Sequence, residues 1–329
     1  MRVGLELSAL RQTRAGAARY IEGLAARFDS RGDVELERLA FGGSGRAAAV
    51  VRDSLWYPVG LSRAAGRARL DVLHCPTFRG PLRSRMPVVM TVLDVAVLRR
   101  PELFNRWNRT YSRLLAPRAV RAARRLIAIS EFTKIELVEL LGVEPERVRV
   151  IGVPADEGFR PSGAATEGDY VLAVGTLEPR KNLRRVVEAA GRAGVELRIA
   201  GASGWGGVSA DGAGVRWLGE VSDERLAALY RGARCLAYPS LYEGFGVPIL
   251  EAMACGTPVV TSAGGATEEV AGGAAVLVDP LDPASIAAGL EEADRRRPEL
   301  REAGLRRARE YSWDAVAEAT VEVYREAVA

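Results

Sequence analysis

The chain has 329 residues, of which 48% are hydrophobic and 27% are charged. This length favours two domains, and the composition excludes a wholly disordered chain. There is no apolar run of the roughly 20 residues that span a bilayer, and the N-terminus lacks the pattern of a signal peptide, so we expect a cytoplasmic protein.

Cysteine and histidine are scarce. Cys75, Cys235 and Cys255 are far apart and odd in number, which predicts reduced structural thiols. The single histidine, His74, cannot form a multi-histidine zinc site. We therefore expect no metal.

Charge is unevenly distributed along the chain. Residues 1–160 hold 28 Lys and Arg against 17 Asp and Glu, a net charge of +11, and residues 161–329 have a net charge of −7. A basic half beside an acidic half indicates that the first half meets something anionic.

The first half alternates between short apolar strands and helices. We predict strands over residues 2–7, 34–40, 71–75, 88–92, 126–129 and 148–151, and helices over 15–28, 102–125 and 131–141, with a loop over 8–14. Pro117 breaks or kinks the second of these helices. Ser130 caps the third, and Gly142 ends it.

Residues 152–169, rich in Gly, Pro and small polar residues, form the best candidate for a linker. A second series follows, with strands over 170–174, 195–200, 215–218, 234–238, 258–261 and 274–278, and helices over 182–193, 223–232, 248–254, 283–296 and 300–329. The last helix is interrupted near Tyr311. Alternating strands and helices in both halves predict an α/β fold with two doubly wound, Rossmann-like parallel sheets.

The most informative segment is PSLYEGFGVPILEAMACGTPVVT, residues 239–261. Pro248 suits the first turn of a helix, and Gly256 ends that helix. A glycine loop that leads into a helix presents backbone N–H groups at the positive end of the helix dipole, which makes an anion site. Glu243 precedes the helix and Glu251 lies within it, so one carboxylate can face a sugar and the other a ribose diol.

This Glu-x7-Glu pattern resembles the nucleotide-sugar site of retaining glycosyltransferase family 4 (glycosyl transferases group 1), which has the GT-B fold. The resemblance covers nearly the whole chain and includes GTLEPRKN at 175–182, LGEVSD at 218–223, EVAG at 269–272, VDP at 278–280 and YSW at 311–313. It implies two Rossmann-like domains that face each other across a cleft, and a terminal helix that crosses back to the first domain. It also implies metal-independent, retaining transfer from a nucleotide-diphosphate sugar, without a cofactor.

The resemblance assigns donor-binding roles in the second half. Arg180 and Lys181 would neutralise the diphosphate leaving group, and Arg180 takes over from the Arg that many relatives carry where this chain has Thr176. Glu251 would bind the ribose hydroxyls, and Glu243, a catalytic candidate, would act near the donor sugar as nucleophile, electrostatic stabiliser or positioner. Backbone N–H groups would come from the loop of Gly244, Phe245, Gly246 and Val247. The alternatives are two solvated loop cations for Arg180 and Lys181, an exposed helix residue for Glu251 and a plain tight turn for the glycine loop.

In the first half, Gly16 matches the family's glycine loop, where the backbone can approach the donor phosphate or the acceptor. Its alternative is an ordinary helix start. Asp94 is a catalytic candidate through contact with the sugar or the acceptor, and a turn or cap is the alternative. His74 is interpreted as a structural residue at a strand end, with a place in the acceptor cleft as the alternative.

Relatives commonly carry His before this Asp, where the chain has Leu93. A leucine cannot donate a hydrogen bond. Three interpretations compete: the donor is a 6-deoxy sugar, the enzyme tolerates the loss with an ordinary hexose, or the chain is weakly active or a non-catalytic partner.

Nine arginines and a single acid, Glu102, lie between Arg99 and Arg125, interleaved with Trp107, Tyr111, Leu114 and Leu115. This pattern is typical of a basic amphipathic helix on an anionic membrane surface, or of a site for a pyrophosphate-linked lipid, with a solvated helix face as the alternative. Nucleic-acid binding is not expected, since no such module occurs.

We therefore expect an acceptor-binding domain over residues 1–158, a nucleotide-sugar-binding domain over 159–310 and the terminal helix over 311–329. The expected function is hexosyl transfer to a glycan or lipid-linked glycan of a cell-envelope pathway, at most peripherally bound to the inner face of the membrane. The alternatives are a non-catalytic, nucleotide-sugar-binding partner subunit, a sugar-nucleotide epimerase and a phosphorylase.

Overall fold

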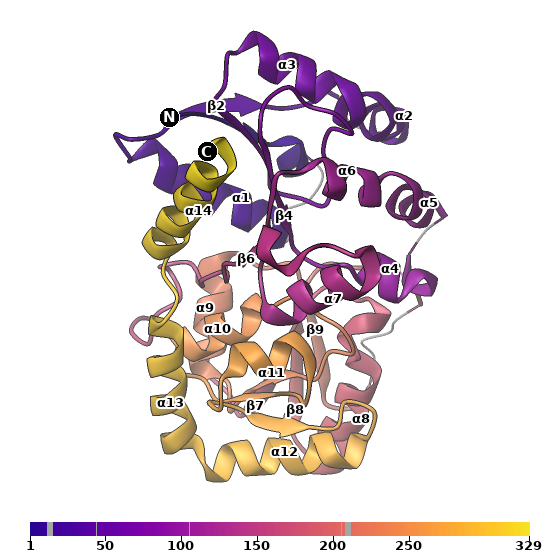
Figure 1. Cartoon of the computed structure of the whole chain (residues 1–329). Helices are drawn as coiled ribbons and strands as arrows, with labels where there is room; N and C mark the ends of the chain where they lie inside the picture. Colours follow the sequence, from indigo (N-terminus) through magenta and orange to yellow (C-terminus); the bar gives the residue numbers. More distant parts are fainter. Residues whose placement is uncertain (12–15, 44, 105, 205, 208–211) are drawn as a thin grey trace. The chain divides into compact units, whose positions relative to one another are not determined.

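The computed structural model describes residues 1–11, 16–43, 45–104, 106–204, 206–207 and 212–329. The chain divides into two compact units: unit 1 comprises Met1–Val153 and Trp313–Ala329, and unit 2 comprises Pro154–Ser312. Each unit holds a six-stranded parallel sheet flanked by helices (Figure 1). The expectation of two doubly wound sheets is thus confirmed.

The sheet of unit 1 consists of β1 (Arg2–Glu6), β2 (Glu35–Leu39), β3 (Val72–Cys75), β4 (Val88–Val92), β5 (Arg125–Ala128) and β6 (Val148–Val150). Its order is β2-β1-β3-β4-β5-β6, and every neighbouring pair is parallel. β3 and β4 are buried along their whole length, as expected for strands covered on both faces. The order switches between β1 and β3, where open α/β sheets bind ligands at the carboxyl ends of their strands.

The helical segments of unit 1 are η1 (Ser8–Arg11), α1 (Gly16–Asp29), α2 (Gly45–Val51), η2 (Arg52–Gly60), α3 (Leu61–Arg67), α4 (Ala96–Arg99), η3 (Pro101–Leu103), α5 (Arg106–Leu114), α6 (Ala116–Ala122), α7 (Glu131–Leu141), η4 (Pro145–Arg147) and α14 (Trp313–Val328). The caps of α7 are confirmed: the Ser130 hydroxyl accepts the Thr133 N–H at 3.0 Å, and Gly142 has a φ of +62°.

The predicted break at Pro117 is confirmed: residues 102–125 contain two helices, α5 and α6, and Pro117 lies in the first turn of α6. One prediction for unit 1 is wrong in part. The expected loop over 8–14 begins with a short 3-10 helix, and residues 12–15 lie outside the described part.

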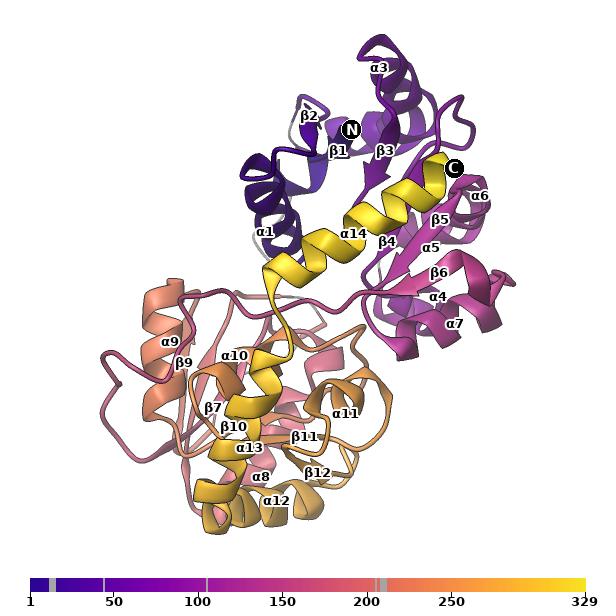
Figure 2. The same ribbon diagram turned by 60° about the vertical axis from the view of Figure 1, so that its left-hand side comes forward.

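The terminal helix α14 belongs to unit 1, where it packs against α1 and the sheet (Figure 2). Buried hydrogen bonds join them: His74 Nδ1 lies 2.7 Å from the Tyr324 hydroxyl, and Nε2 lies 2.8 Å from Thr91 Oγ1. Thr91 also contacts the Tyr20 hydroxyl of α1 at 3.1 Å. Burial lowers the pKa of His74 to about 3, so the ring is neutral. The structural interpretation of His74 is confirmed.

The sheet of unit 2 consists of β7 (Tyr170–Val174), β8 (Glu196–Ala200), β9 (Val215–Gly219), β10 (Leu236–Tyr238), β11 (Val259–Ser262) and β12 (Val276–Val278). Its order, β12-β11-β10-β7-β8-β9, is that of a Rossmann sheet, with the switch between β7 and β10. The helical segments are η5 (Pro179–Lys181), α8 (Leu183–Ala193), α9 (Asp223–Gly232), α10 (Val247–Ala254), α11 (Gly265–Ala271), α12 (Pro283–Arg295) and α13 (Arg297–Arg309).

Candidate functional site

The candidate site of unit 2 lies at the switch between β7 and β10. The loop after β7 carries Arg180 and Lys181, and the loop after β10 carries Glu243. Asn182 joins the two loops: its buried side-chain amide donates to the carbonyl of Pro239 at 2.9 Å and to that of Pro280 at 2.6 Å. This fixes the two cations beside the end of β10.

Glu243 and the two cations form one cluster. Arg180 Nη1 donates to Glu243 Oε2 at 2.7 Å, and Lys181 Nζ donates to Oε1 at 2.7 Å. The Glu243 residue is only 8% exposed. Burial alone would raise the pKa of this carboxyl, but Lys181 and Arg180 outweigh that effect and lower it to about 2. The side chain is therefore ionised at neutral pH.

A second carboxylate completes the charge balance. Glu178, 2% exposed, pairs with Arg180 Nη2 at 2.8 Å. Its Oε2 atom is buried and makes no hydrogen bond within the described part of the chain. Two carboxylates and two cations therefore leave the cluster with no net charge, and an incoming anion would compete with Glu178 and Glu243 for the same donors.

Sequence reasoning missed Tyr238, the last residue of β10. Its hydroxyl accepts a hydrogen bond from Lys181 Nζ at 2.7 Å, and that ammonium lies 4.9 Å from the centre of its ring. The apolar pattern of the strand made Tyr238 look like an ordinary core residue. The contact between Tyr238 and Lys181 becomes visible only in the folded structure.

The loop after Glu243 begins α10 as the motif predicted. Gly246 has a φ of +110°, a conformation that favours glycine, and Val247 and Pro248 form the first turn. Among the described residues, no group accepts the backbone N–H of Phe245, Gly246 or Val247. These N–H groups lie at the N-terminus of α10, where the helix dipole favours a bound anion. Phe245 is buried against Tyr311, with ring centres 5.8 Å apart.

Glu251 lies inside α10 and is 1% exposed. The Tyr230 hydroxyl of α9 donates to its Oε2 at 2.9 Å. The exposed helix carboxylate considered as its alternative is therefore wrong. The ribose contact stays a prediction, and it requires this side chain to become accessible when a donor binds.

The candidate residues of unit 1 have more ordinary local roles. Gly16 begins α1, and a Cβ at this position would meet nothing within 4 Å. Asp94 follows β4, and its Oδ1 accepts the Ala96 N–H at 3.0 Å, which makes it a turn residue as well as a site candidate. Leu93 beside it is half-buried. Residues 12–15 of the expected glycine loop, Arg14 and Ala15 among them, lie outside the described part.

The arginine-rich stretch presents a basic surface. Arg99 pairs with Glu136 and Glu139 of α7, and Arg125 pairs with Glu326. Seven further arginines are exposed: Arg100, Arg106, Arg109, Arg113, Arg118, Arg121 and Arg124. Trp107 and Leu114 are 40% and 54% exposed, whereas Tyr111 is buried. In the described residues, no helix has the length and apolarity needed to cross a membrane.

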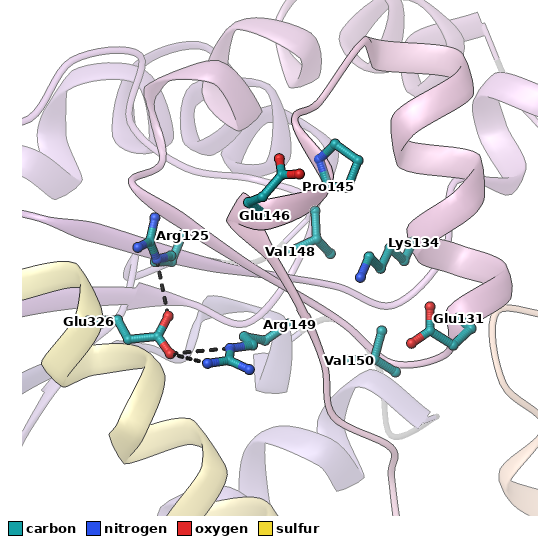
Figure 3. Close-up of a pocket in the computed structure, with 9 residues that line it drawn as sticks. All are labelled: Arg125, Glu131, Lys134, Pro145, Glu146, Val148, Arg149, Val150 and Glu326. Carbon is teal, nitrogen blue, oxygen red and sulfur yellow. Dashed lines mark hydrogen bonds and ion pairs between the residues drawn. The ribbon is translucent and has the colours of Figure 1, made fainter.

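A cavity of about 630 Å³ lies beside β6 in unit 1 (Figure 3). Its charges already balance one another, because Glu326 of α14 binds both Arg125 and Arg149, at 3.2 Å and 2.5 Å. Lys134 shares the cavity with Glu131 and Glu146. This edge of the sheet lies away from the β1/β3 switch, so we assign no site to it. Within the described residues, no group of three His, Cys, Asp or Glu side chains is arranged to hold a metal ion.

Comparisons with known proteins identify the family of the chain. Residues 14–157 match the model of the family described as Glycosyltransferase Family 4, and residues 155–311 match that described as Glycosyl transferases group 1. The O-antigen chain mannosyltransferase B of Escherichia coli is 30% identical over 284 residues, which cover 77% of this chain and 74% of that protein. The MMP alpha-(1->4)-mannosyltransferase of Mycolicibacterium hassiacum is 30% identical over 306 residues, covering 81% and 73%.

Solved structures share the fold. The sucrose-phosphate synthase of Thermosynechococcus elongatus superposes with a TM-score of 0.80 at 17% identity, covering 99% of this chain and 98% of the other. HepE of Anabaena, solved in complex with UDP and glucose, superposes with a TM-score of 0.74 at 18% identity, covering 99% and 100%. The expected family is confirmed: the chain belongs to the family 4 glycosyltransferases and has their GT-B fold.

Proposed function

We propose that the chain transfers a hexosyl group from a nucleoside-diphosphate hexose to a hydroxyl of a glycan or lipid-linked glycan, with retention of configuration. The observation that carries this proposal is the cluster of Arg180, Lys181 and Glu243 at the β7/β10 switch. It combines two fixed cations for a leaving diphosphate with an ionised carboxylate for the positive charge that develops on the sugar.

The reaction needs few groups from the protein. The bond between the anomeric carbon and the diphosphate breaks while the acceptor oxygen attacks the same face, and the acceptor proton passes to a diphosphate oxygen. Arg180, Lys181 and the N–H groups at the start of α10 stabilise the departing charge. Glu243 positions the sugar and stabilises its transition state. Glu251 binds the ribose in this scheme, and Asp94 contacts the sugar or the acceptor.

The proposal includes independence from a metal and from a bound cofactor. Arg180 and Lys181 supply two positive charges where a divalent cation would otherwise neutralise the diphosphate. We therefore expect turnover to be unchanged by EDTA. A loss of turnover in EDTA that Mg²⁺ or Mn²⁺ restores would contradict this part.

The names of related proteins support the proposed classes of donor and acceptor. Two of them are mannosyltransferases, one acting on an O-antigen chain, and HepE binds UDP and glucose. From these we propose a hexose donor and an envelope glycan acceptor for this chain.

The test is a screen of UDP-, GDP- and dTDP-hexoses for nucleotide release, with the anomeric configuration of the product read by NMR. Arg180→Met should abolish release, because it removes a cation from the diphosphate. Arg184→Met is the matched control, since Arg184 is an exposed residue of α8 four positions along. If the wild-type chain binds a donor but releases no nucleotide with any acceptor tested, the result would favour the non-catalytic partner subunit.

We also propose a peripheral contact with the anionic inner face of a membrane. Exposed Trp107 and Leu114 lie on α5 among exposed arginines such as Arg109 and Arg113, a combination that suits an interface. Sedimentation with phosphatidylglycerol vesicles should recover the chain, and phosphatidylcholine vesicles should not. If the double variant Arg109→Glu/Arg113→Glu sediments with phosphatidylglycerol vesicles as well as the wild type does, the proposed membrane contact is wrong.

A further inference from the structure

Helix α13 lies beside the donor-site helix α10 and packs against it (Figures 1 and 2). Along this contact the two helices approach closely, because a Cβ on Gly304 of α13 would lie only 3.0 Å from Met253 Cγ of α10. Just beyond the C-terminal end of α10, Arg301 Nη1 donates to the Gly256 carbonyl at 3.1 Å. The position of α10, and with it that of the N–H groups at its start, therefore depends on α13.

At the start of α10, contact is made by Tyr311, two residues beyond the end of α13. Its N–H donates to the Ala308 carbonyl at 3.3 Å, which fixes it to the end of that helix. Its ring meets the Phe245 ring edge-on, with an interplanar angle of 82° and ring centres 5.8 Å apart. Phe245 is only 4% exposed, so this contact anchors the donor loop, which we define as residues 244–247.

Arg307 of α13 holds Tyr311 in this position. Its Nη2 donates to the Tyr311 hydroxyl at 2.8 Å, and its Cζ lies 5.1 Å from the centre of the same ring. The guanidinium also binds the last turn of α11, from Nε to the Val270 carbonyl at 2.9 Å and from Nη2 to the Glu269 carbonyl at 2.8 Å. Gly272 leaves room for this approach, because a Cβ there would lie 2.5 Å from Arg307 Nε.

Helix α11 contacts the donor loop as well. It packs against α10, and a Cβ on Gly246 would lie 3.6 Å from Thr267 Cγ2 of α11. The donor loop therefore touches two elements, α11 and Tyr311, and Arg307 binds these two elements to each other. A loop that is held in this way keeps its N–H groups oriented before a ligand arrives, and preorganised donors bind an anion without the cost of ordering them.

We propose that Tyr311 and Arg307 are positioning residues of the donor site. They fix the donor loop so that its N–H groups meet the diphosphate, and they thereby set how much the second phosphate contributes to binding. This inference rests on the proposed function and deepens it, because it assigns a role in donor binding to two residues that we do not place against the donor.

The test compares nucleoside monophosphates with nucleoside diphosphates on the whole chain. Titration calorimetry with UMP and UDP, GMP and GDP, and dTMP and dTDP gives the ratio of the two Kd values for each base. This ratio measures the contribution of the second phosphate, whereas a general loss of stability would lower both affinities and leave the ratio unchanged. Tyr311→Leu removes the ring that anchors Phe245, and it should lower the ratio about tenfold, the effect of losing a hydrogen bond to a charged group.

Three further variants sharpen the test. Tyr311→Phe keeps the ring and loses only the hydroxyl, so it should retain most of the ratio. Arg307→Met releases α11 and Tyr311 together and should lower the ratio as Tyr311→Leu does. Arg306→Met is the matched control, because Arg306 is an exposed neighbour that pairs with Glu302 of the same helix, and it should bind as the wild type does. If Arg307→Met does not fold, the two variants of the half-buried Tyr311 decide the question.

The outcomes distinguish this inference from the proposed function. A preference of the wild type for the diphosphate that is lost in Tyr311→Leu and kept in Tyr311→Phe and Arg306→Met supports the positioning role. An unchanged ratio in Tyr311→Leu overturns that role, even if both affinities fall, because Tyr311 would then only stabilise the fold. An equal loss in Tyr311→Phe overturns it too, since the ring would not be what holds the loop. A wild-type chain with no preference for the diphosphate would count against the donor assignment itself, and this inference would be wrong as well.

Discussion

Lys181 and Glu243 form a buried ion pair in which the ammonium nitrogen lies 2.7 Å from the carboxylate oxygen Oε1. Arg180 binds the other oxygen at the same distance, so one carboxylate occupies both cations that we assign to the diphosphate. The carboxylate therefore acts as an internal anion at this site. It keeps both cations oriented before a donor arrives, and it must release or share them when one binds.

The first prediction concerns Glu243→Gln, which keeps the shape of the side chain and removes its charge. We expect a nucleoside diphosphate to bind several-fold more tightly, because the competing carboxylate is gone, while transfer falls about 10²–10³-fold through the loss of transition-state stabilisation. Titration calorimetry and product formation measure the two effects. Weaker nucleotide binding by the variant would mean that Glu243 orients the cations and does not compete for them.

A second prediction concerns the hydroxyl of Tyr238. Tyr238→Phe removes the acceptor that fixes Lys181 at 2.7 Å, and we expect nucleotide affinity to fall about five- to tenfold, the usual effect of one hydrogen bond. Tyr170→Phe is the matched control, because it deletes a buried hydroxyl bound to the Leu229 carbonyl at 2.7 Å from the first residue of β7. The control should lower the melting temperature and leave nucleotide affinity unchanged. Equal affinity in Tyr238→Phe and wild type would remove Tyr238 from the site.

A third prediction separates the three interpretations of Leu93. Family resemblance assigns this position to the neighbourhood of the donor sugar, where Leu93→His would add a hydrogen-bond donor. We expect the wild-type chain to use an ordinary hexose donor, and the variant to improve kcat/KM for the hexose about tenfold relative to its 6-deoxy analogue. Wild-type preference for the 6-deoxy donor would instead make Leu93 a specificity residue. Inactivity of both proteins with every donor would favour the non-catalytic interpretation.

Much of the fold follows from local sequence signals. Ser130 and Gly142 bound α7 as predicted, and the buried strands were recognised because helix-covered parallel strands are almost continuously apolar. The segment that forms α2, η2 and α3 was not predicted. Its π-helical turns do not follow the 3.6-residue period, and Pro58 lies inside it.

The candidate site was predictable in part. The Glu-x7-Glu motif identified Glu243, and the segment after β7 identified Arg180 and Lys181, but their contact depends on β7 pairing with β10. Strand order is a property of the whole sheet, and no local pattern encodes it.

The last prediction concerns the buried network of His74. Burial lowers the pKa of its ring to about 3, against an ordinary value of 6.5 in the unfolded chain. Between these values the unfolded state binds one more proton than the folded state, so stability is complete above pH 6.5 and falls as the pH decreases towards 3. Between pH 7 and pH 5 the free energy of unfolding should decrease by about 2 kcal/mol.

His74 is the only histidine of the chain, and most carboxyl groups titrate below pH 5. Burial raises the pKa of the Glu6 carboxyl in the same unit, which acts in the opposite direction, so the contribution of His74 is read from the difference between the wild type and His74→Gln. Urea unfolding followed by tryptophan fluorescence reports on unit 1, which contains Trp56, Trp107 and Trp313 of the five tryptophans. His74→Gln should lower stability at pH 7 and lose the dependence between pH 7 and 5. Nitrogen-15 NMR of the single imidazole gives a direct check: a titration midpoint near 6.5 in the folded chain would contradict the buried, neutral ring between Tyr324 and Thr91.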